Sequence, residues 1–298
     1  MQNENKGMLL GFIAVCAFGL TLPATRVAVS YFDPIFIGLG RASLAAIVAA
    51  ILLLIFKVKI PTKPQWVKLA LVAAGVVIGF PVLTSIAMQT LPAAHGGVIL
   101  GVLPLATTTM AVVVAHERPS VGFWLVGFIG SCLVITFALV DGAGGIQLAD
   151  LVLLGAIFAA AVGYALGATL VKELGGWQVI CWALVLVFPL NILPAISSAP
   201  TELAAVPIQG WLSFLYLALI SQLCGFFIWY KGLDLGGIAR VSQVQLLQPF
   251  ITLFAAVILL GESINMMTVM FVLVVVATVW LGKKMPVAKA KTESGAER

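Results

Sequence analysis

The segment GVLPLATTTMAVVVAHERPS at residues 101–120 recurs as QLLQPFITLFAAVILLGESI at residues 245–264. At an offset of 145 residues, both copies carry a proline inside an apolar run and a glutamate 13 residues later. Further matches at this offset or the adjacent one extend the repeat: Trp66 with Trp211, Pro104 with Pro249, Thr107 with Thr252, Ala111 with Ala256, Glu117 with Glu262, Gly11 with Gly155, and Gly19 with Gly163. The chain is therefore two copies of one unit.

The composition indicates a membrane protein. Of the 298 residues, 62% are hydrophobic and 9% are charged, and the mean hydropathy is +1.17. About 20 apolar residues in a helix cross about 30 Å of hydrocarbon. Runs of this length predict ten spans, at residues 8–30, 34–56, 66–88, 94–116, 121–140, 151–171, 178–196, 211–230, 238–260 and 264–282.

Each copy of the repeat holds five of these spans. Because five is odd, the second copy enters the membrane upside down, an arrangement typical of secondary transporters. We therefore expect an all-α integral membrane protein with ten transmembrane helices, built as two inverted five-helix repeats around a central cavity. The expected domains are an N-terminal segment (1–7), repeat 1 (8–140), a connecting loop (141–149), repeat 2 (150–283) and a disordered tail (284–298).

The distribution of basic residues sets the expected orientation. With ten spans and a cytoplasmic N-terminus, all of the 16 basic residues except Arg26 and Arg41 fall on the cytoplasmic side, as the positive-inside rule requires. Both termini are then cytoplasmic. Loop lysines of this kind contact lipid headgroups, so the basic charge gives no reason to expect nucleic acid as a partner. The four cysteines lie inside predicted spans without a CxxC pair, and we interpret them as buried small side chains.

The two repeated segments quoted above, together with Gly11, Gly19 and Arg41, resemble EamA domains of the drug/metabolite transporter superfamily. The resemblance covers about residues 8–283. It implies a ten-helix exporter in a bacterial inner membrane, and within the superfamily the chain is most similar to bacterial amino-acid exporters, including those for aromatic amino acids. The first helix departs from the family pattern, because it carries Phe18 where a tryptophan often precedes the glycine.

Polar and aromatic side chains inside the predicted spans are candidates for binding substrate, because such groups normally face protein or a wet cavity. Amides hold polar ligands without burying a full charge, and tyrosine or tryptophan suits an amphipathic molecule. Helical spacing puts Ile99 on one face with His95, although a hydrogen bond from His95 to a helix-end carbonyl is an alternative. The predicted substrate-binding residues are Phe18, Thr84, His95, Ile99, Tyr164, Trp182, Gln243 and Gln245.

A second group of residues is predicted to form hinges and gates. Pro104 and Pro249 each remove a backbone hydrogen bond in matching spans. Near the outer face Arg26, Arg41 and Glu262 are expected to form a cluster of ion pairs, unless the arginines extend to the headgroups. Glu117 with Lys57 or Arg118 is its expected inner counterpart, and Arg240 lies at the inner mouth of the cavity.

These features predict a monomeric exporter of small neutral or amphipathic metabolites, most plausibly amino acids, working by alternating access. Its partners are its substrate and lipid. The sequence shows no nucleotide-binding motif, metal-ligand cluster or catalytic pair, so we expect no ATP use, cofactor, metal or enzymatic activity. Two alternatives stay open: a carrier of phosphorylated or nucleotide-linked metabolites, and a passive channel. With both arginines assigned toward the outer face, the predicted membrane midplane contains no fixed charge, and the cavity is expected to present few.

Overall fold

A computed structural model describes residues 2–116, 118–141, 147–285 and 287–288. Within these residues the chain is helical, apart from a short antiparallel pairing of β1 (Arg118–Pro119) with β2 (Val287–Ala288). Most of the expected connecting loop and most of the expected tail lie outside the described residues. The prediction of an all-helical membrane protein is confirmed at this level.

The helices follow one another along the whole described chain. In chain order they are α1 (Gln2–Gly19), α2 (Thr21–Ala28), the π-helix η1 (Phe36–Gly40), α3 (Arg41–Ile55), α4 (Lys63–Val72), the π-helix η2 (Ala73–Gly79), α5 (Phe80–Ala87), α6 (Ala93–Ile99), the 3₁₀ helix η3 (Leu100–Val102), α7 (Leu103–Ala115), α8 (Val121–Asp141), α9 (Leu148–Leu174), α10 (Gly176–Ser197), the 3₁₀ helix η4 (Leu203–Ala205), α11 (Ile208–Leu215), the π-helix η5 (Tyr216–Cys224), α12 (Gly225–Gly236), α13 (Ile238–Ser242), the 3₁₀ helix η6 (Gln243–Leu247), α14 (Gln248–Leu260) and α15 (Met266–Lys284).

Eight continuous helical stretches are long and apolar enough to cross a membrane. They correspond to spans one to four and six to nine of the sequence prediction: Asn5–Ala28, Phe36–Ile55, Lys63–Ala87, Ala93–Ala115, Leu148–Leu174, Gly176–Ser197, Ile208–Gly236 and Ile238–Leu260. The helices α8 and α15 occupy the fifth and tenth predicted positions. A count of ten spans, and their inverted arrangement, stay predictions.

Four of these stretches begin three residues earlier than expected, and in two of them a polar side chain caps the start of the helix. Gln65 accepts a hydrogen bond from the backbone N–H of Thr62 at 2.8 Å, and the helix starts at Lys63. Asp150 likewise accepts from the N–H of Gln147 at 2.9 Å. Capping of this kind satisfies N–H groups that have no partner inside the helix.

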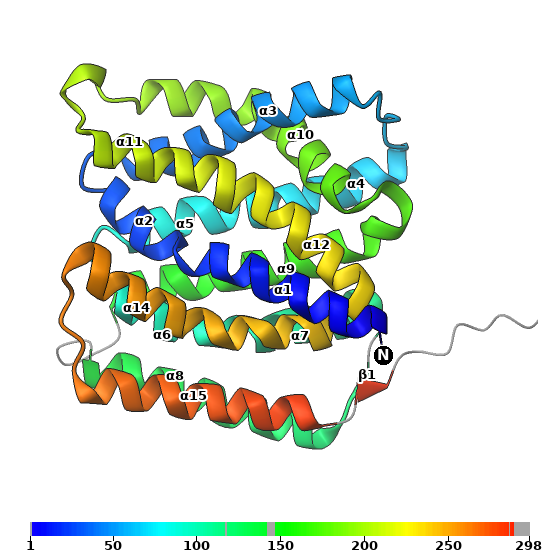
Figure 1. Cartoon of the computed structure of the whole chain (residues 1–298), viewed down its shortest axis with the longest axis vertical. Coiled ribbons are helices and arrows are strands. Elements are labelled where there is room, and N and C mark those ends of the chain that lie inside the picture. The colour runs from blue at the N-terminus through cyan, green and yellow to red at the C-terminus, as the bar shows by residue number, and fades with distance from the viewer. Residues whose placement is uncertain (1, 117, 142–146, 286, 289–298) are drawn as a thin grey trace, which may run out of the picture.

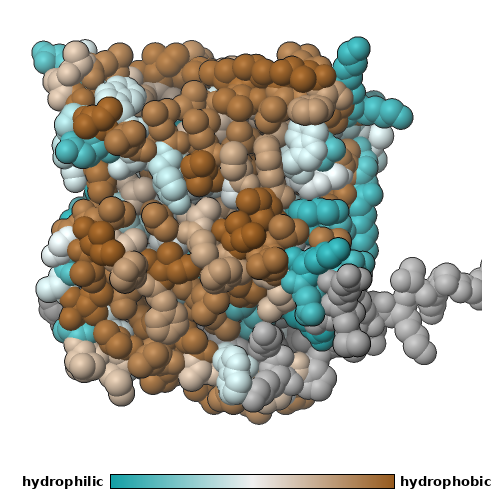
Figure 2. Space-filling model, viewed as in Figure 1, coloured by the Kyte–Doolittle hydropathy of each residue, from teal (hydrophilic) through white to brown (hydrophobic). Residues whose placement is uncertain are grey.

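The two halves of the sequence are interleaved in space. The most extensive helix pairings each join one half to the other: α1 with α12, α7 with α9, α3 with α10, and α8 with α15 (Figure 1). The pair α8 and α15 forms one edge of the molecule (Figure 1). Figure 2 shows an apolar band across the face in view, with hydrophilic residues toward its two ends. We call the end that carries residue 2 the N-terminal face and the opposite end the distal face.

Candidate functional site

A small cavity lies between the two halves, about halfway along the spans that enclose it. Gln222 is the midpoint of the span Ile208–Gly236, and Gln248 comes one residue before the midpoint of Ile238–Leu260. The cavity volume is about 10 Å³, which is about the space that one water molecule requires. The wall consists of Phe18, Thr21, Arg41, Val76, Phe80, Tyr164, Ser221, Gln222, Phe226 and Gln248. Both halves of the sequence therefore contribute to it.

One polar part of this wall depends on a π-helical segment followed by a proline. At the end of η2, the N–H of Phe80 bonds to the carbonyl of Gly75, five residues back. The next residue, Pro81, has no N–H to donate, so the carbonyl of Val76 is left without a helical partner. Gln222 donates its Nε2 to that carbonyl at 2.9 Å. This hydrogen bond fixes the Gln222 amide at the cavity wall.

A second proline opens the first span beside the cavity. Pro23 cannot donate to the carbonyl of Gly19, four residues back, and the helix is interrupted at Leu20 between α1 and α2. Thr252 of α14 donates its hydroxyl to the Gly19 carbonyl at 2.7 Å. On the neighbouring turn, the hydroxyls of Thr21 and Ser221 bond to each other at 2.9 Å. Intramembrane carbonyls freed by proline are thus satisfied by side chains from the other half.

Arg41 is the charged group of the cavity. It is the first residue of α3, directly after the π-helix η1, and its exposed fraction is 1%. No acceptor for its Nε or Nη1 is found among the residues that the structure describes. A cation at this position is costly unless it faces a polar partner or a wet space. Arg41 thus lies in the cavity wall rather than in an ion-pair cluster with Arg26 and Glu262, and it is the fixed charge of a cavity that was expected to hold few.

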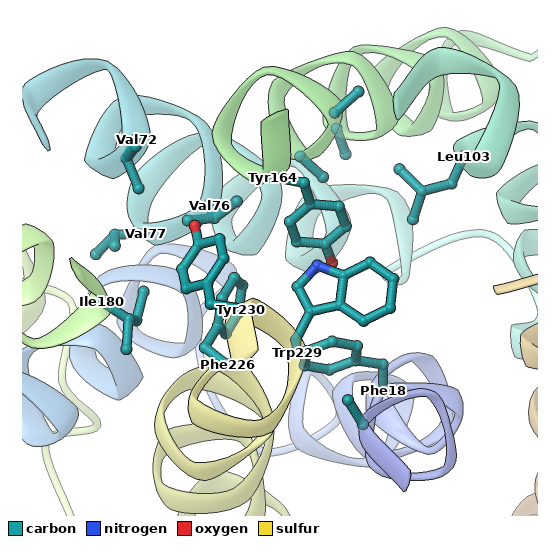
Figure 3. Packing of buried hydrophobic residues seen from close by; sticks show 14 of the residues in the cluster. Phe18, Val72, Val76, Val77, Leu103, Tyr164, Ile180, Phe226, Trp229 and Tyr230 are labelled. Carbon is teal, nitrogen blue, oxygen red and sulfur yellow. The ribbon is translucent and has the colours of Figure 1, made fainter. Parts of the chain in front are cut away.

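Aromatic rings form the apolar part of the wall. Phe18 and Tyr164 are stacked at 6.4 Å between centroids, and Phe226 lies 5.3 Å from Phe18 and 5.8 Å from Tyr164. Trp229 packs behind them, 5.3 Å from Tyr164 (Figure 3). These rings come from α1, α9 and α12. Their faces suit the apolar body of a small molecule.

A larger pocket of about 730 Å³ opens at the distal face, and we call it the distal pocket. Its wall includes Leu20, Arg26, Tyr216 and Glu262. Leu20 is next in sequence to Thr21 of the central cavity, so one turn of helix separates the two spaces. Tyr216 donates its hydroxyl to the Ala17 carbonyl at 2.5 Å across this barrier.

The N-terminal face is closed by close packing of α1 against α12. A Cβ atom on Gly7 would lie 2.6 Å from the backbone nitrogen of Gly236 and 2.8 Å from the carbonyl oxygen of Gly232. Only glycine allows two helix backbones to approach this closely. The first span is therefore in backbone contact with the span Ile208–Gly236 toward the N-terminal face.

The sequence pattern of the EamA-like transporter family matches this chain twice, at residues 5–140 and at residues 147–282. The chain belongs to the EamA-like transporter family. It is 46% identical over 265 residues to a Bacillus subtilis (strain 168) protein named "Uncharacterized transporter YdeK", which covers 89% of this chain and 92% of that protein. A second B. subtilis (strain 168) protein, "Uncharacterized transporter YyaM", is 24% identical over 255 residues and covers 83% of each chain.

One solved structure, titled "Crystal structure of protein", is similar in fold to this EamA-family chain. The TM-score is 0.70 at 16% sequence identity, over 93% of this chain and 98% of that one. A likeness at this identity concerns the fold alone. Together with the family match, it makes this chain a multi-pass membrane transporter of the EamA family.

Among the predicted substrate-binding residues of this EamA transporter, Phe18 and Tyr164 line the central cavity. Gln243 and Gln245 are buried, and neither lines it. Gln243 instead borders an apolar groove of about 380 Å³ with Phe12 and Trp280. Both amides lack hydrogen-bond partners within the described part of the chain.

His95 forms a buried pair with an acidic residue. Its Nε2 lies 2.8 Å from Oδ1 of Asp150, and Asp150 is 1% exposed. The ring also packs 5.1 Å from Phe137, and Ile99 is buried one turn further along the same span. This carboxylate, which the sequence assigned to the outer end of a span, was not among the predicted contacts of His95.

Two further predicted residues have local roles. Thr84 donates to the carbonyls of Phe80 and Pro81, at 2.6 and 3.1 Å, as threonines in membrane helices often do. Trp182 packs edge-on against Trp66 at 5.5 Å. Neither side chain is part of the cavity wall.

The predicted distal cluster of ion pairs takes another form. Arg26 donates to the carbonyls of Met88 and Gln89 at 2.5 and 2.7 Å. Glu262 accepts from the N–H groups of Ala93 and Ala94 at 2.9 and 3.0 Å. The arginine thus holds the end of span three, and the carboxylate caps the start of span four.

The remaining predicted gating residues are Arg240, Glu117 and the two matched prolines. Arg240 lies exposed in α13, and Glu117 is outside the described residues. Pro104 and Pro249 are each the second residue of an α-helix that directly follows a 3₁₀ segment. Within the part of the chain that the structure describes, no three His, Cys, Asp or Glu side chains are grouped so that they could hold a metal ion.

The glutamines of the cavity wall differ from those that the sequence favoured. Sequence reasoning preferred Gln243 and Gln245, whereas Gln222 and Gln248 line the cavity. The sequence signal for Gln222 is Pro81 in another span. Pro81 has no N–H to donate, so in a π-helix the carbonyl of Val76, five residues earlier, needs a donor from elsewhere. The π-helical register that creates this need was not visible in the apolar pattern.

Proposed function

We propose that this EamA transporter exports small amphipathic metabolites, most notably amino acids and including aromatic ones, across the bacterial inner membrane by alternating access without ATP. The observation that carries the proposal is the mid-span cavity, whose wall combines aromatic rings with amide and hydroxyl groups from both halves. Such a combination suits a molecule with one apolar and one polar end.

The proposed architecture is ten spans in two inverted copies, residues 8–140 and 150–283, with both termini in the cytoplasm and no second subunit or cofactor. Three matched features support the copies at the offset of 145: the π-helices η2 and η5, the 3₁₀ segments η3 and η6, and the left-handed residues His116 and Gly261. Inverted copies around a shared site are the usual basis of alternating access.

The shape of the molecule supports an opening at one face at a time. The distal pocket is open and wide, whereas α1 and α12 are in backbone contact toward the N-terminal face. Two hydrogen bonds, Tyr216 to Ala17 and Thr21 with Ser221, lie between the distal pocket and the central cavity. In the proposed cycle these bonds break to admit or release substrate, and the glycine contact separates in the opposite state.

The alternatives fit the cavity less well. A phosphorylated metabolite carries up to two negative charges on its phosphate, and Arg41 is the one cation in the described cavity wall. A passive channel needs a continuous wet path, whereas the central cavity holds about 10 Å³ and is separated from the distal pocket by a helical turn.

Counterflow in proteoliposomes tests the proposal. Vesicles containing the full chain are preloaded with one unlabelled amino acid at a time, or with glucose 6-phosphate, and uptake of the same labelled compound is followed. We expect saturable, trans-stimulated uptake of at least one amphipathic amino acid. Tyr164→Leu should reduce it, whereas Phe254→Leu, at a 69% exposed position, should not. Uptake of the sugar phosphate alone, or flux without saturation or trans-stimulation, would exclude the proposal.

A further inference from the structure

Arg41 stands apart from the other charged side chains of the described chain because its charge is buried without a counter-ion. Acidic side chains of the described chain have partners elsewhere: Asp33 with the N–H of Ile35, Asp150 with His95, Glu173 with Lys68, Asp234 with Lys231, and Glu262 with the start of α6. None of them lines the central cavity. Within the described wall, the site therefore carries one positive charge and no negative one.

The wall around Arg41 places an acceptor and apolar surface beside this cation. The Oε1 atom of Gln248 is buried and has no donor among the described residues. Gln222 has committed its Nε2 to the Val76 carbonyl. Phe18, Tyr164 and Phe226 complete the wall. A buried donor and a buried acceptor that the protein itself leaves unpaired each cost free energy unless a ligand satisfies them.

We infer that Arg41 binds the carboxylate of the transported metabolite. Guanidinium matches a carboxylate with parallel charge-assisted hydrogen bonds, which are about twice as strong as neutral ones. The side-chain carbonyl of Gln248 then accepts a hydrogen bond from a donor on the same metabolite, such as an ammonium group. The three rings contact the apolar side chain of the metabolite. An α-amino acid with an apolar side chain presents these groups together.

This inference rests on the proposed function and narrows it. It requires that the carboxylate is the main recognition element, so that removing it from the substrate costs more than removing the amino group. Charge-assisted hydrogen bonds contribute about 1.5–3 kcal/mol, which corresponds to a roughly tenfold to hundredfold change in affinity. The neutral acceptor at Gln248 contributes less.

The test compares three competitors of the amino acid that gives the strongest counterflow: the amino acid itself, its carboxamide, and the carboxylic acid that lacks the amino group. In the parent, the carboxamide should compete about tenfold to a hundredfold less well than the amino acid. Equal competition by the carboxamide in the parent would overturn the inference without any variant.

Three variants then assign the effect to Arg41. In Arg41→Gln, the amino acid and its carboxamide should compete equally, and a preference like that of the parent would overturn the inference. Arg41→Lys keeps the charge but loses the planar guanidinium, so it should show a reduced preference for the amino acid over its carboxamide. An unchanged preference would rule out two parallel hydrogen bonds between Arg41 and the carboxylate. Lys172→Gln removes an exposed cation and should behave like the parent.

A binding measurement separates this inference from the proposed function. Melting of the purified full chain is followed with the amino acid and with its carboxamide. If no compound gives counterflow, the proposed export function fails and this measurement alone decides the role of Arg41. Stabilisation by the carboxylate form, lost in Arg41→Lys or Arg41→Gln, supports the inference; equal stabilisation by both forms overturns it.

Discussion

The fourth span of each half breaks in the same way and carries different side chains. In the first half, η3 (Leu100–Val102) precedes Pro104, and in the second half, η6 (Gln243–Leu247) precedes Pro249. At the offset of 145, Val98, Leu100 and Leu103 correspond to Gln243, Gln245 and Gln248. The first break is apolar throughout, whereas the second carries three amides.

The comparison separates the cause of the backbone shape from the cause of the binding chemistry. A proline removes one helical hydrogen bond whatever its neighbours are, so both copies tighten into a 3₁₀ turn. The polar side chains occur in the second copy, where Gln248 lines the central cavity. Its counterpart in the first copy, Leu103, is buried in the core. The symmetric backbone thus surrounds an asymmetric site.

Exchanging the side chains at this matched pair should give the largest effect. Gln248→Leu removes the proposed acceptor and should lower counterflow by up to about tenfold with little change in melting, because one hydrogen bond contributes roughly 0.5–1.5 kcal/mol. Leu103→Gln buries an amide among apolar neighbours and should destabilise the fold by about 2 kcal/mol.

Each of these two variants serves as the control for the other. Transport and melting in detergent are measured on both variants and on the double exchange. If Gln248→Leu retained full transport, or if Leu103→Gln left melting unchanged, the two breaks would be interchangeable and the asymmetry would have no functional meaning.

The matched threonines one turn further on should give the next largest effect. Thr252 donates to the carbonyl that Pro23 frees at Gly19, while its counterpart Thr107 has a buried hydroxyl with no partner among the described residues. Thr252→Val should cost about 1.5 kcal/mol, near the upper end for hydrogen bonds between membrane helices. Thr107→Val should be neutral or slightly stabilising, because it removes an unsatisfied group. Equal losses in thermal melting would contradict this assignment.

A smaller loss is expected at the glutamate that follows the second break. Glu262 caps the first turn of α6 through two N–H groups, and a carboxylate at a helix N-terminus contributes about 1 kcal/mol or less. Glu262→Gln should lower the melting temperature accordingly, and more at low salt than at high salt. Glu202→Gln, an exposed position on the same face, is the control; a drop as large there would show a general charge effect.

Much of the fold could be predicted from the sequence. Apolar run length located the eight spans that the structure supports, because the thickness of the hydrocarbon layer sets that length. The helix starts at Lys63 and Leu148 were missed by three residues, since Gln65 and Asp150 cap them with polar side chains that hydropathy counts as loop. Breaks at Pro23, Pro104 and Pro249 follow from the missing N–H.

The candidate site was harder to predict, because it depends on which side chains from separate spans meet at the same cavity. Of the two predicted residues in the cavity wall, Tyr164 follows the repeated Gly163, and Phe18 stands where the family pattern often has a tryptophan. Arg41 was expected in an ion-pair cluster, since its distance along the chain from the span end does not reveal that its side chain lines the central cavity. Its role is visible only when the aromatic and amide walls from other spans are placed around it.

The smallest expected effect concerns the ends of the two matched spans. His116 and Gly261 occupy equivalent left-handed positions, with φ of 53° and 63°. A non-glycine residue there carries roughly 1–2 kcal/mol of steric strain, partly offset because glycine loses more chain entropy on folding. His116→Gly should therefore stabilise the protein by about 0.5 kcal/mol, and Gly261→Ala should destabilise it by a similar amount. Chemical denaturation in detergent measures both. Opposite signs are required, because both substitutions act on the same backbone conformation in two copies of one span; a loss of stability in His116→Gly would mean that its side chain contributes contacts the second copy lacks.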